Sequence, residues 1–252
     1  MLLSVLTPSV DGKVAFRQPS AVPGIELEYI VVSDVTPVGK ARNKCLAKAS
    51  GDYVAWVDAD DEIEDGWLYA VKEAIADKPG AVVFGCEETD PVDVAFSHAM
   101  WDVVASRESL VVMSFDEIGQ REDNLFLLRY LNRGIRLKTV RERHYIYRRN
   151  PESQTSRPRT AADSALFIRR AHEVANLTQG QRARIDAECL KELCAWVANH
   201  ANEPCGWQIV RDAFNETVDR RHLKAHWRIA LPFGYWGVKS MMRLCSLKRG
   251  RR

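Results

Sequence analysis

The 252-residue sequence lacks any run of about eighteen uninterrupted apolar residues, so we expect no membrane-spanning helix. Its first residues, MLLSVLTPSVDGK, lack both a basic leader and a long apolar core, which argues against a signal peptide. The formal net charge is only +2 and no nucleic-acid-binding motif is present, so we expect no nucleic-acid partner. The six cysteines lack CxxC pairs and zinc-type spacing, which indicates reduced thiols in a cytoplasmic protein.

The first half of the chain alternates short apolar strands with helices. Strands are predicted at residues 2–6, 28–32, 53–57 and 81–84, and helices at 38–48 and 63–76. This alternation is typical of a parallel or mostly parallel sheet flanked by helices, in which ligands bind beyond the carboxyl ends of the strands. Later in the chain the strand signals fade. Helices are predicted there at 161–175, 179–201 and 208–227, which indicates a helical C-terminal extension.

The stretch YVAWVDADDEIEDGW crowds acidic residues directly after a predicted strand. Like charges this close repel each other, so either a cation or solvent must surround Asp58, Asp60, Asp61 and Glu62. Asp58 and Asp60 are two residues apart, and in an extended chain their carboxylates point to the same side. They could therefore share one Mg²⁺ or Mn²⁺, which would in turn neutralise a diphosphate.

Three other interpretations of these acids compete with a metal site. An EF-hand loop starting at Asp58 would need Gly at its sixth position and Glu at its twelfth, and the sequence has neither. A nucleotide site of the Walker type would need a P-loop, which the sequence lacks. A helix start stays open, because Asp61, Glu62 and Glu64 would be stabilised in the first turn of a helix at 63–76.

Two longer stretches resemble the motifs of family 2 glycosyltransferases. Residues 38–67, VGKARNKCLAKASGDYVAWVDADDEIEDGW, resemble the central motif, in which an ARN helix is followed by GDY and a strand that delivers D-x-DD. Residues 121–149, REDNLFLLRYLNRGIRLKTVRERHYIYRR, resemble the block that opens with Glu-Asp and ends in Y-x-YR. Residues 100–110, MWDVVASRESL, resemble more loosely the stretch that precedes this block.

The resemblance covers residues 1–156 and implies an α/β fold of the GT-A type. This is a Rossmann-like, mixed, mostly parallel sheet flanked by helices. Residues 157–252 match nothing in the family motifs, and we expect them to form the helical extension with a basic amphipathic tail.

The resemblance implies a role for each matched acidic residue. Asp58 would contact the nucleotide and, with Asp60, bind the Mn²⁺ or Mg²⁺ that bridges the donor diphosphate. Asp123 would be the catalytic base that deprotonates the acceptor hydroxyl, and Glu122 would orient it or contact the acceptor. Taken without the resemblance, Glu122 and Asp123 are also explained as acids in the first turn of a helix.

Other candidate residues follow from the same motifs. Arg42 and either Arg148 or Arg149 would hold phosphate oxygens. His144 would be a further metal ligand, although a lone histidine beside basic and aromatic residues is more often structural. Asp34 would contact the nucleotide base, or that contact would be lost, because the family's usual N-terminal segment is short here by one helix and one strand.

The resemblance implies an inverting enzyme of polysaccharide biosynthesis. It would move a sugar from a nucleoside-diphosphate sugar, with a UDP-sugar favoured, to a hydroxyl of a glycan or lipid-linked acceptor. The short N-terminal segment leaves an alternative, a catalytically impaired protein that binds through its helical C-terminal part. Nucleotidyl transfer on a related α/β fold is disfavoured by the Glu122–Asp123 block.

Residues 220–252 carry basic residues and no acidic one, interleaved with aromatics and methionines. This pattern predicts a helical tail whose apolar face packs on its own domain. Alternatively, residues 228–252 would contact the anionic inner face of a membrane as an interfacial helix.

Overall fold

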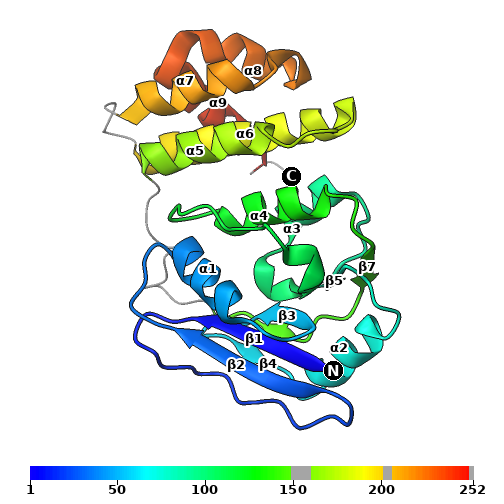
Figure 1. The fold of residues 1–252 in the computed structure, drawn as a ribbon. Helices are drawn as coiled ribbons and strands as arrows, with labels where there is room; N and C mark the ends of the chain where they lie inside the picture. The colour runs from blue at the N-terminus through cyan, green and yellow to red at the C-terminus, as the bar shows by residue number, and fades with distance from the viewer. Residues whose placement is uncertain (149–159, 201–205, 250–252) are drawn as a thin grey trace. The chain divides into compact units, whose positions relative to one another are not determined.

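The computed structural model describes residues 1–148, 160–200 and 206–249, and the chain divides into two compact units, Met1–Gln154 and Thr155–Arg252. The described strands all belong to the first unit. They are β1 (Leu2–Pro8), β2 (Glu26–Val32), β3 (Tyr53–Trp56), β4 (Glu62–Ile63), β5 (Ala81–Phe84), β6 (Val103–Ser106), β7 (Leu137–Val140) and β8 (Tyr145–Ile146). Its helices are α1 (Val38–Lys48), α2 (Trp67–Ile75), α3 (Pro91–Ser97) and α4 (Glu122–Leu131), with 3₁₀ turns at Met100–Asp102 and Glu108–Leu110 (Figure 1).

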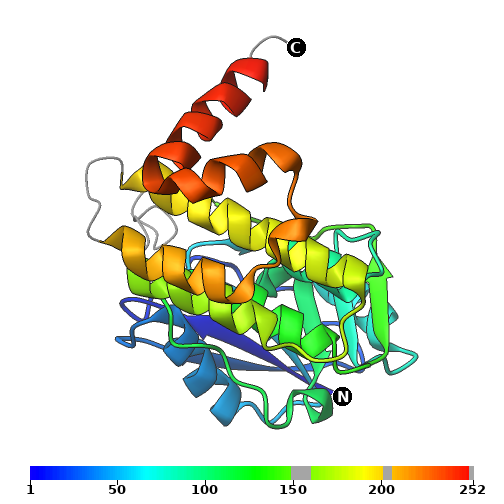
Figure 2. The ribbon, with the colours of Figure 1, turned by 90° about the horizontal axis from the view of Figure 1, so that it is seen from above.

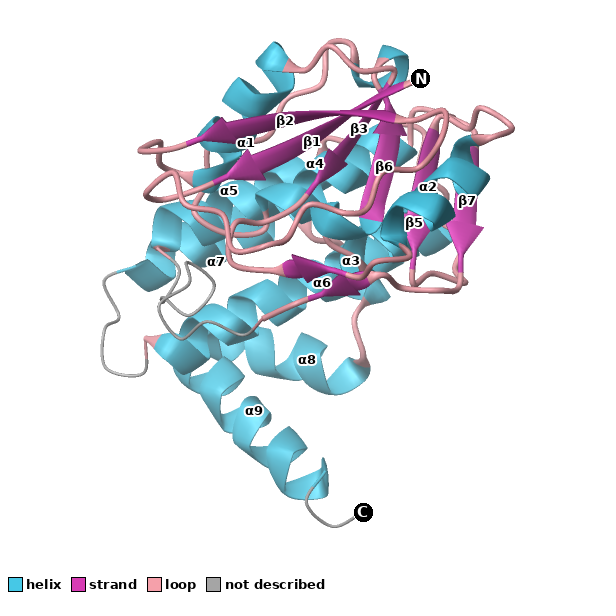
Figure 3. Cartoon of the chain, turned by 90° about the horizontal axis from the view of Figure 1, so that it is seen from below, coloured by secondary structure: helices cyan, strands magenta, loops and turns pink. Residues whose placement is uncertain are grey.

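Six strands form one sheet in the order β2-β1-β3-β6-β5-β7 (Figure 3). β1 pairs in parallel with β2 and β3, and β5 pairs in parallel with β7. β6 runs antiparallel between β3 and β5. The sheet is therefore mixed and mostly parallel, which confirms the fold class expected from the sequence.

The inner strands β1, β3 and β5 are buried on both faces of the sheet, which explains why they read as continuous apolar runs. On one face, Val5 of β1 belongs to the same core cluster as Leu68 of α2. On the other face, the Trp56 ring packs edge-on against Phe126 of α4, with ring centres 6.2 Å apart. α2 therefore covers one face, and α4 lies over the other together with α1 and α3 (Figures 1 and 3).

Gly51 allows the chain to pass close to β1 before it enters β3. The Gly51 N–H donates to Ser4 Oγ at 2.8 Å, and the Asp52 N–H donates to the Leu2 carbonyl at 2.7 Å. A Cβ at Gly51 would lie 2.7 Å from the Ser4 nitrogen, so a larger residue would displace this backbone. The GDY sequence thus fixes the start of the strand whose other end carries Asp58.

The structure corrects one expectation about the acidic stretch. The helix predicted at 63–76 begins at Trp67, and α2 has no acidic residue in its first turn. The interpretation of Asp61, Glu62 and Glu64 as first-turn acids is therefore wrong. Residues of this stretch instead form β4, which pairs antiparallel with β8 in a separate two-stranded sheet. Pairing with a segment distant in sequence overrode the local helix preference.

The second unit is helical in its described residues. Its helices are α5 (Ala161–His172), α6 (Gln179–Asn199), α7 (Trp207–Thr217), α8 (Ala225–Ala230) and α9 (Gly234–Arg249), with 3₁₀ turns at Arg220–His222 and Leu231–Phe233. α5, α6 and α7 lie side by side (Figure 2). The helix predicted at 208–227 is interrupted after Thr217, where Asp219 caps a 3₁₀ turn. Within the described ranges, no helix is both long and apolar enough to cross a membrane.

Candidate active site

Arg42 of α1 joins two acidic motifs inside the first unit. It is 4% exposed, and its Nη1 donates to Glu122 Oε1 while its Nη2 donates to Asp58 Oδ1 at 3.2 Å. The guanidinium also lies 5.7 Å from the ring centre of Phe115. Arg42 therefore connects the loop after β3 with the first turn of α4, the two places where the sequence predicted functional acids.

The electrostatics of this group depend on burial and on charge together. Burial lowers the pKa of Arg42, but the neighbouring carboxylates Asp58, Glu122 and Asp123 raise it more, so the guanidinium stays charged. Burial raises the pKa of Glu122 and of Asp58, and Arg42 opposes this rise in both cases. The negative charge of Asp123 raises both pKa values further. Asp123 is thus within electrostatic reach of the other three residues.

The close packing of α1 requires Gly39. A Cβ at Gly39 would lie far inside van der Waals contact with the Asp116 carbonyl oxygen, and 3.4 Å from Cγ of Glu122. One turn later, Asn43 Nδ2 donates to the Phe115 carbonyl at 3.0 Å, and the Phe115 N–H donates to Asn43 Oδ1 at 2.7 Å. These contacts hold α1 against the segment that leads into α4, and so they set the position of the guanidinium.

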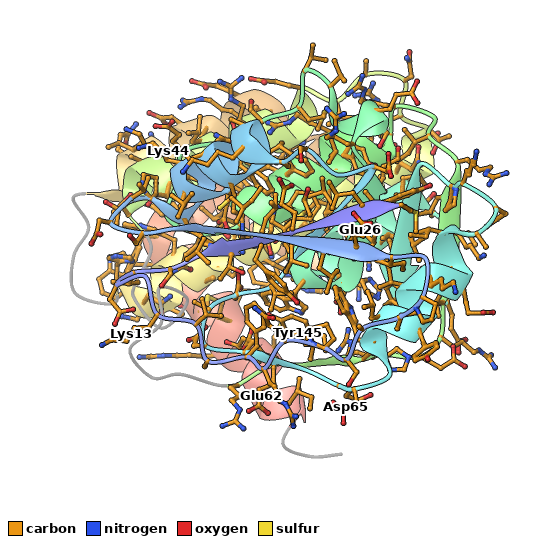
Figure 4. All side chains as sticks on the ribbon, turned by 60° about the horizontal axis from the view of Figure 1, so that its bottom comes forward. Lys13, Glu26, Lys44, Glu62, Asp65 and Tyr145 are labelled. Atoms are coloured by element: carbon orange, nitrogen blue, oxygen red, sulfur yellow. The ribbon has the colours of Figure 1, made fainter. Side chains whose placement is uncertain are left out.

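Asp61 fastens the Y-x-YR segment to the acidic stretch. Tyr145 Oη donates to Asp61 Oδ2 at 2.6 Å and accepts from the Asp58 N–H at 3.1 Å. The Arg148 N–H donates to Asp61 Oδ1 at 2.7 Å, and its guanidinium pairs with Glu62 Oε1 at 2.5 Å. Burial raises the pKa of Asp61, and the donors Tyr145 and Arg148 limit that rise. Figure 4 labels Glu62 and Tyr145 on the two segments that pair as β4 and β8.

The middle motif, residues 100–110, also contacts the Y-x-YR segment. The Trp101 ring stacks on Tyr145 and on Tyr147, with ring centres 5.6 and 5.3 Å away. Beside it, Arg143 Nη2 donates to Asp102 Oδ2 at 3.1 Å. All three stretches that carry the family resemblance are therefore in mutual contact.

Comparison with known families agrees with this arrangement. The model of glycosyl transferase family 2 matches residues 24–173, which is more than half of the chain. The chain belongs to glycosyl transferase family 2. The resemblance seen in the sequence motifs is thereby confirmed. A sequence search of curated proteins gave no match.

Solved structures share the fold of this family 2 glycosyl transferase. Residues 1–349 of TarS from S. aureus, in complex with UDP-GlcNAc, superpose with a TM-score of 0.61 at 16% identity, over 88% of this chain and 83% of that chain. The same part of TarS in complex with UDP has a TM-score of 0.58 at 15% identity, over 86% and 83%. Glucosyl-3-phosphoglycerate synthase from Mycobacterium tuberculosis, with Mn²⁺, UDP and phosphoglyceric acid, has a TM-score of 0.41 at 16% identity, over 71% and 80%, which is too weak to bear on the fold.

Three other predicted site residues lie at more exposed positions. Asp60 is exposed in the turn after β3. Asp34 is exposed after β2, in the left-handed region at φ 57° that Asp tolerates. Since β2 and β3 are both parallel to β1, Asp34 and Asp60 follow strands that end at the same edge of the sheet. His144 Nδ1 lies 3.1 Å from Glu64 Oε2, so a metal bound while this contact is kept would meet the other ring nitrogen, Nε2.

Two arginines expected to hold phosphate have other partners in this structure. The Arg42 guanidinium is buried between two carboxylates, which indicates that it positions the acids rather than meeting a phosphate directly. Arg148 is exposed at its side chain and pairs with Glu62. Arg149 lies outside the described residues. Tyr145 and Trp101 were not among the predicted site residues, although both stand inside the motifs that resemble the family.

Proposed function

We propose that the first unit transfers a sugar from a nucleoside-diphosphate sugar, with a UDP-sugar favoured, to an acceptor hydroxyl with inversion at the anomeric carbon. The observation that carries this proposal is the buried Arg42, which ties Asp58 of the D-x-DD motif to Glu122 of the Glu-Asp motif. Family membership supports glycosyl transfer. The fold shared with TarS, whose structure contains UDP-GlcNAc, supports a UDP-sugar as the donor.

The acidic residues after β3 fit a hard divalent cation, Mn²⁺ or Mg²⁺. Asp58 and Asp60 offer carboxylate oxygens, the ligands that these ions prefer. Burial raises the pKa of Asp58, and the charges of Asp60 and Asp123 raise it further in spite of Arg42, so added positive charge would be stabilised here. A cation held by Asp58 and Asp60 would stabilise the negative charge that develops on the departing diphosphate.

Asp123 acts as the general base in this proposal. It takes the proton of the acceptor hydroxyl while the hydroxyl oxygen attacks the anomeric carbon, and the bond from that carbon to the diphosphate oxygen breaks. One displacement of this kind inverts the configuration. Glu122, held by Arg42, fixes the first turn of α4 and so positions Asp123. Asp34 would contact the nucleotide base, and Arg148 a phosphate oxygen.

The acceptor in this proposal is a glycan or a lipid-linked glycan. The second unit favours the lipid-linked form, because Trp236 and Ile229 are 70% and 64% exposed on the basic C-terminal segment. Lys239 Nζ lies 5.1 Å from the ring centre of Trp236, which places a cation beside the exposed aromatic ring. An aromatic ring next to a basic side chain suits the headgroup region of an anionic membrane. We therefore propose a cytoplasmic protein whose residues 228–252 contact the inner membrane face.

The test measures hydrolysis of a panel of nucleoside-diphosphate sugars with and without Mn²⁺. We expect one donor to be turned over only with the metal, Asp60→Ala to abolish this metal-dependent turnover, and Asp123→Asn to lower turnover by about 10²–10⁴-fold while nucleotide binding is kept. Asp65→Asn is the matched control, because Asp65 is an exposed acid of the same acidic stretch, between β4 and α2, and it should behave as wild type (Figure 4). Metal-independent turnover, or full activity in Asp60→Ala, would exclude this mechanism.

One observation favours the impaired binding protein as a second candidate. Residues 9–25 join β1 to β2 without a helix, where the family usually has a long one. If that loss removed the nucleotide site, neither UDP nor UDP-sugars would raise the melting temperature in the presence of Mn²⁺. Stabilisation by UDP together with the metal would exclude this second candidate.

A further inference from the structure

A group of metal-ligating side chains lies outside the acidic site, at the carboxyl end of β5. Cys86 and Glu88 stand in the loop between β5 and α3, and His98 follows the last residue of α3. One potential ligand atom from each of the three lies within 4.8 Å of the other two. The thiol and the imidazole are buried, and the carboxylate is exposed.

The backbone holds the first and last of these residues in place. The Cys86 N–H donates to the Val140 carbonyl of β7 at 3.0 Å, and the His98 N–H donates to the Val94 carbonyl of α3 at 3.1 Å. The loop between them ends at Asp90, whose side chain caps the start of α3 by accepting the Val92 N–H at 2.8 Å. Backbone hydrogen bonds to β7 and to α3 thus hold Cys86 and His98 in position.

The hydrogen bonding of His98 leaves one ring nitrogen ready to bind a metal. Its Nε2 lies 3.2 Å from the Gly85 carbonyl oxygen, which can only accept, so Nε2 carries the proton. In the neutral ring Nδ1 then presents a lone pair. His98 is only 7% exposed, and its Nδ1 has no hydrogen-bond partner among the described residues. A histidine that binds a metal through one ring nitrogen usually donates the N–H of its other ring nitrogen to a backbone carbonyl, a carboxylate or water.

The spacing of the other two ligand atoms suits a zinc ion. Cys86 Sγ lies 3.5 Å from Glu88 Oε2. With Zn–S of about 2.3 Å, Zn–O of about 2.0 Å and a tetrahedral angle, the two atoms would be about 3.5 Å apart. A thiolate also favours zinc over Mg²⁺ or Mn²⁺, which prefer oxygen ligands.

A buried carboxylate next to the group strengthens this assignment. Asp102 interacts electrostatically with both Cys86 and His98. It is 2% exposed, and while Oδ2 accepts from Arg143, its Oδ1 has no hydrogen-bond partner in the part of the chain that the structure describes. Two buried polar atoms without partners at one place are unusual in a folded protein unless water or an ion satisfies them.

We propose that Cys86, Glu88 and His98 form a second metal site, which binds Zn²⁺ or a similar thiophilic divalent cation. On binding, the Cys86 thiol releases its proton to solvent and the thiolate takes the metal. Three protein ligands leave a fourth position for water, or for Asp102 after a side-chain shift. The site shares no residue with the Asp58–Asp60 pair, and it does not depend on the proposed transferase activity.

The test titrates chelator-treated full-length protein with Zn²⁺ in competition with a chromogenic chelator, and with Co²⁺ to record its absorption spectrum. We expect one tight Zn²⁺ equivalent and a thiolate-to-cobalt charge-transfer band. Cys86→Ser and His98→Gln should each weaken Zn²⁺ binding by roughly tenfold or more and remove or alter the cobalt spectrum. Glu88→Gln should also weaken binding, and because Glu88 is exposed this variant tests the site without a risk to folding.

Two controls make the result specific. Cys45→Ser replaces another buried thiol, whose Sγ faces the Ile30 carbonyl, and Asp60→Ala alters the acidic site; both should bind Zn²⁺ as wild type does. The proposal is overturned if wild type binds no tighter than Cys86→Ser, if cobalt shows no thiolate band, or if Cys45→Ser loses as much affinity. Unchanged affinity in Glu88→Gln would remove the carboxylate from the site and would also overturn it.

Discussion

Replacement of Arg42 by Met is the most direct test of how the acidic site is held together. Arg42, Glu122 and Asp58 have side-chain exposures of 4%, 6% and 22%, so the guanidinium neutralises two carboxylates largely out of water. Methionine replaces the aliphatic stem of the arginine side chain but not its guanidinium, and it leaves both carboxylates without their cation. The variant therefore removes the charge, the hydrogen bonds and the contact with the Phe115 ring, while keeping an unbranched apolar stem on α1.

The expected loss of stability is large. Removal of one partner from a buried ion pair destabilises a protein by about 3–5 kcal/mol, because the remaining charge is left uncompensated. Since about 1.4 kcal/mol changes an equilibrium constant tenfold, this loss should increase the population of molecules in which α1 and α4 are unfolded at least a hundredfold. In Arg42→Met with Glu122→Gln, the loss should be smaller than the sum of the two single losses, by about 0.5–3 kcal/mol.

The pH dependence has a definite sign. Burial raises the pKa of Asp58 and Glu122 above their ordinary values of 3.8 and 4.5, so the folded state binds these protons more tightly than the unfolded state does. Their contribution to stability therefore falls as the pH rises above those values. Arg42 limits this fall by lowering both pKa values. Its removal should thus destabilise the protein more at about pH 8 than at about pH 5, where the carboxyls can take up protons.

The assay must report on the first unit alone, since the chain has two units. Hydrogen exchange of peptides from α1 and α4, followed by mass spectrometry, does this. Lys44→Met is the matched control, because Lys44 is an exposed cation on the same helix, and it should change stability by less than about 0.5 kcal/mol (Figure 4). If Arg42→Met exchanges like Lys44→Met, or if the effect is larger at low pH, Arg42 does not stabilise these carboxylates.

Three further predictions concern other contacts. Gly39→Ala should destabilise the protein by about 1–3 kcal/mol in urea unfolding, because the new Cβ meets the Asp116 carbonyl; a neutral effect would show that α1 can shift freely. Tyr145→Phe should cost about 1–3 kcal/mol by the same measurement, since buried Asp61 loses a donor, and an unchanged midpoint would contradict that role. Trp236→Ala should weaken sedimentation with phosphatidylserine vesicles, whereas equal binding of wild type to neutral vesicles would argue against an anionic membrane contact.

β1, β3 and β5 were predictable because they are short apolar runs buried on both faces of the sheet. Tyr53–Trp56 and Ala81–Phe84 contain buried residues only, so their composition alone marks them as strands. β6, Val103–Ser106, was not predicted, and its antiparallel direction depends on neighbours on both sides that local sequence does not reveal. β4 was missed for a related reason, because two residues become a strand only when β8 lies beside them.

Two acids that follow β3, Asp58 and Asp61, bind different partners from distant parts of the chain, which the local sequence does not reveal. Asp58 is bound by Arg42 from α1, while Asp61 is bound by Tyr145 and by the Arg148 backbone from a segment more than eighty residues later. Asp61 therefore serves to attach the Y-x-YR segment, which is a structural role inside a motif that was interpreted as a nucleotide and metal site. Burial and the charges of nearby acids raise the pKa of Asp58 and of Asp61 alike. Both oxygens of Asp61 already accept hydrogen bonds, from Tyr145 Oη and from the Arg148 N–H, so our proposal gives the metal to Asp58 and Asp60 rather than to Asp61.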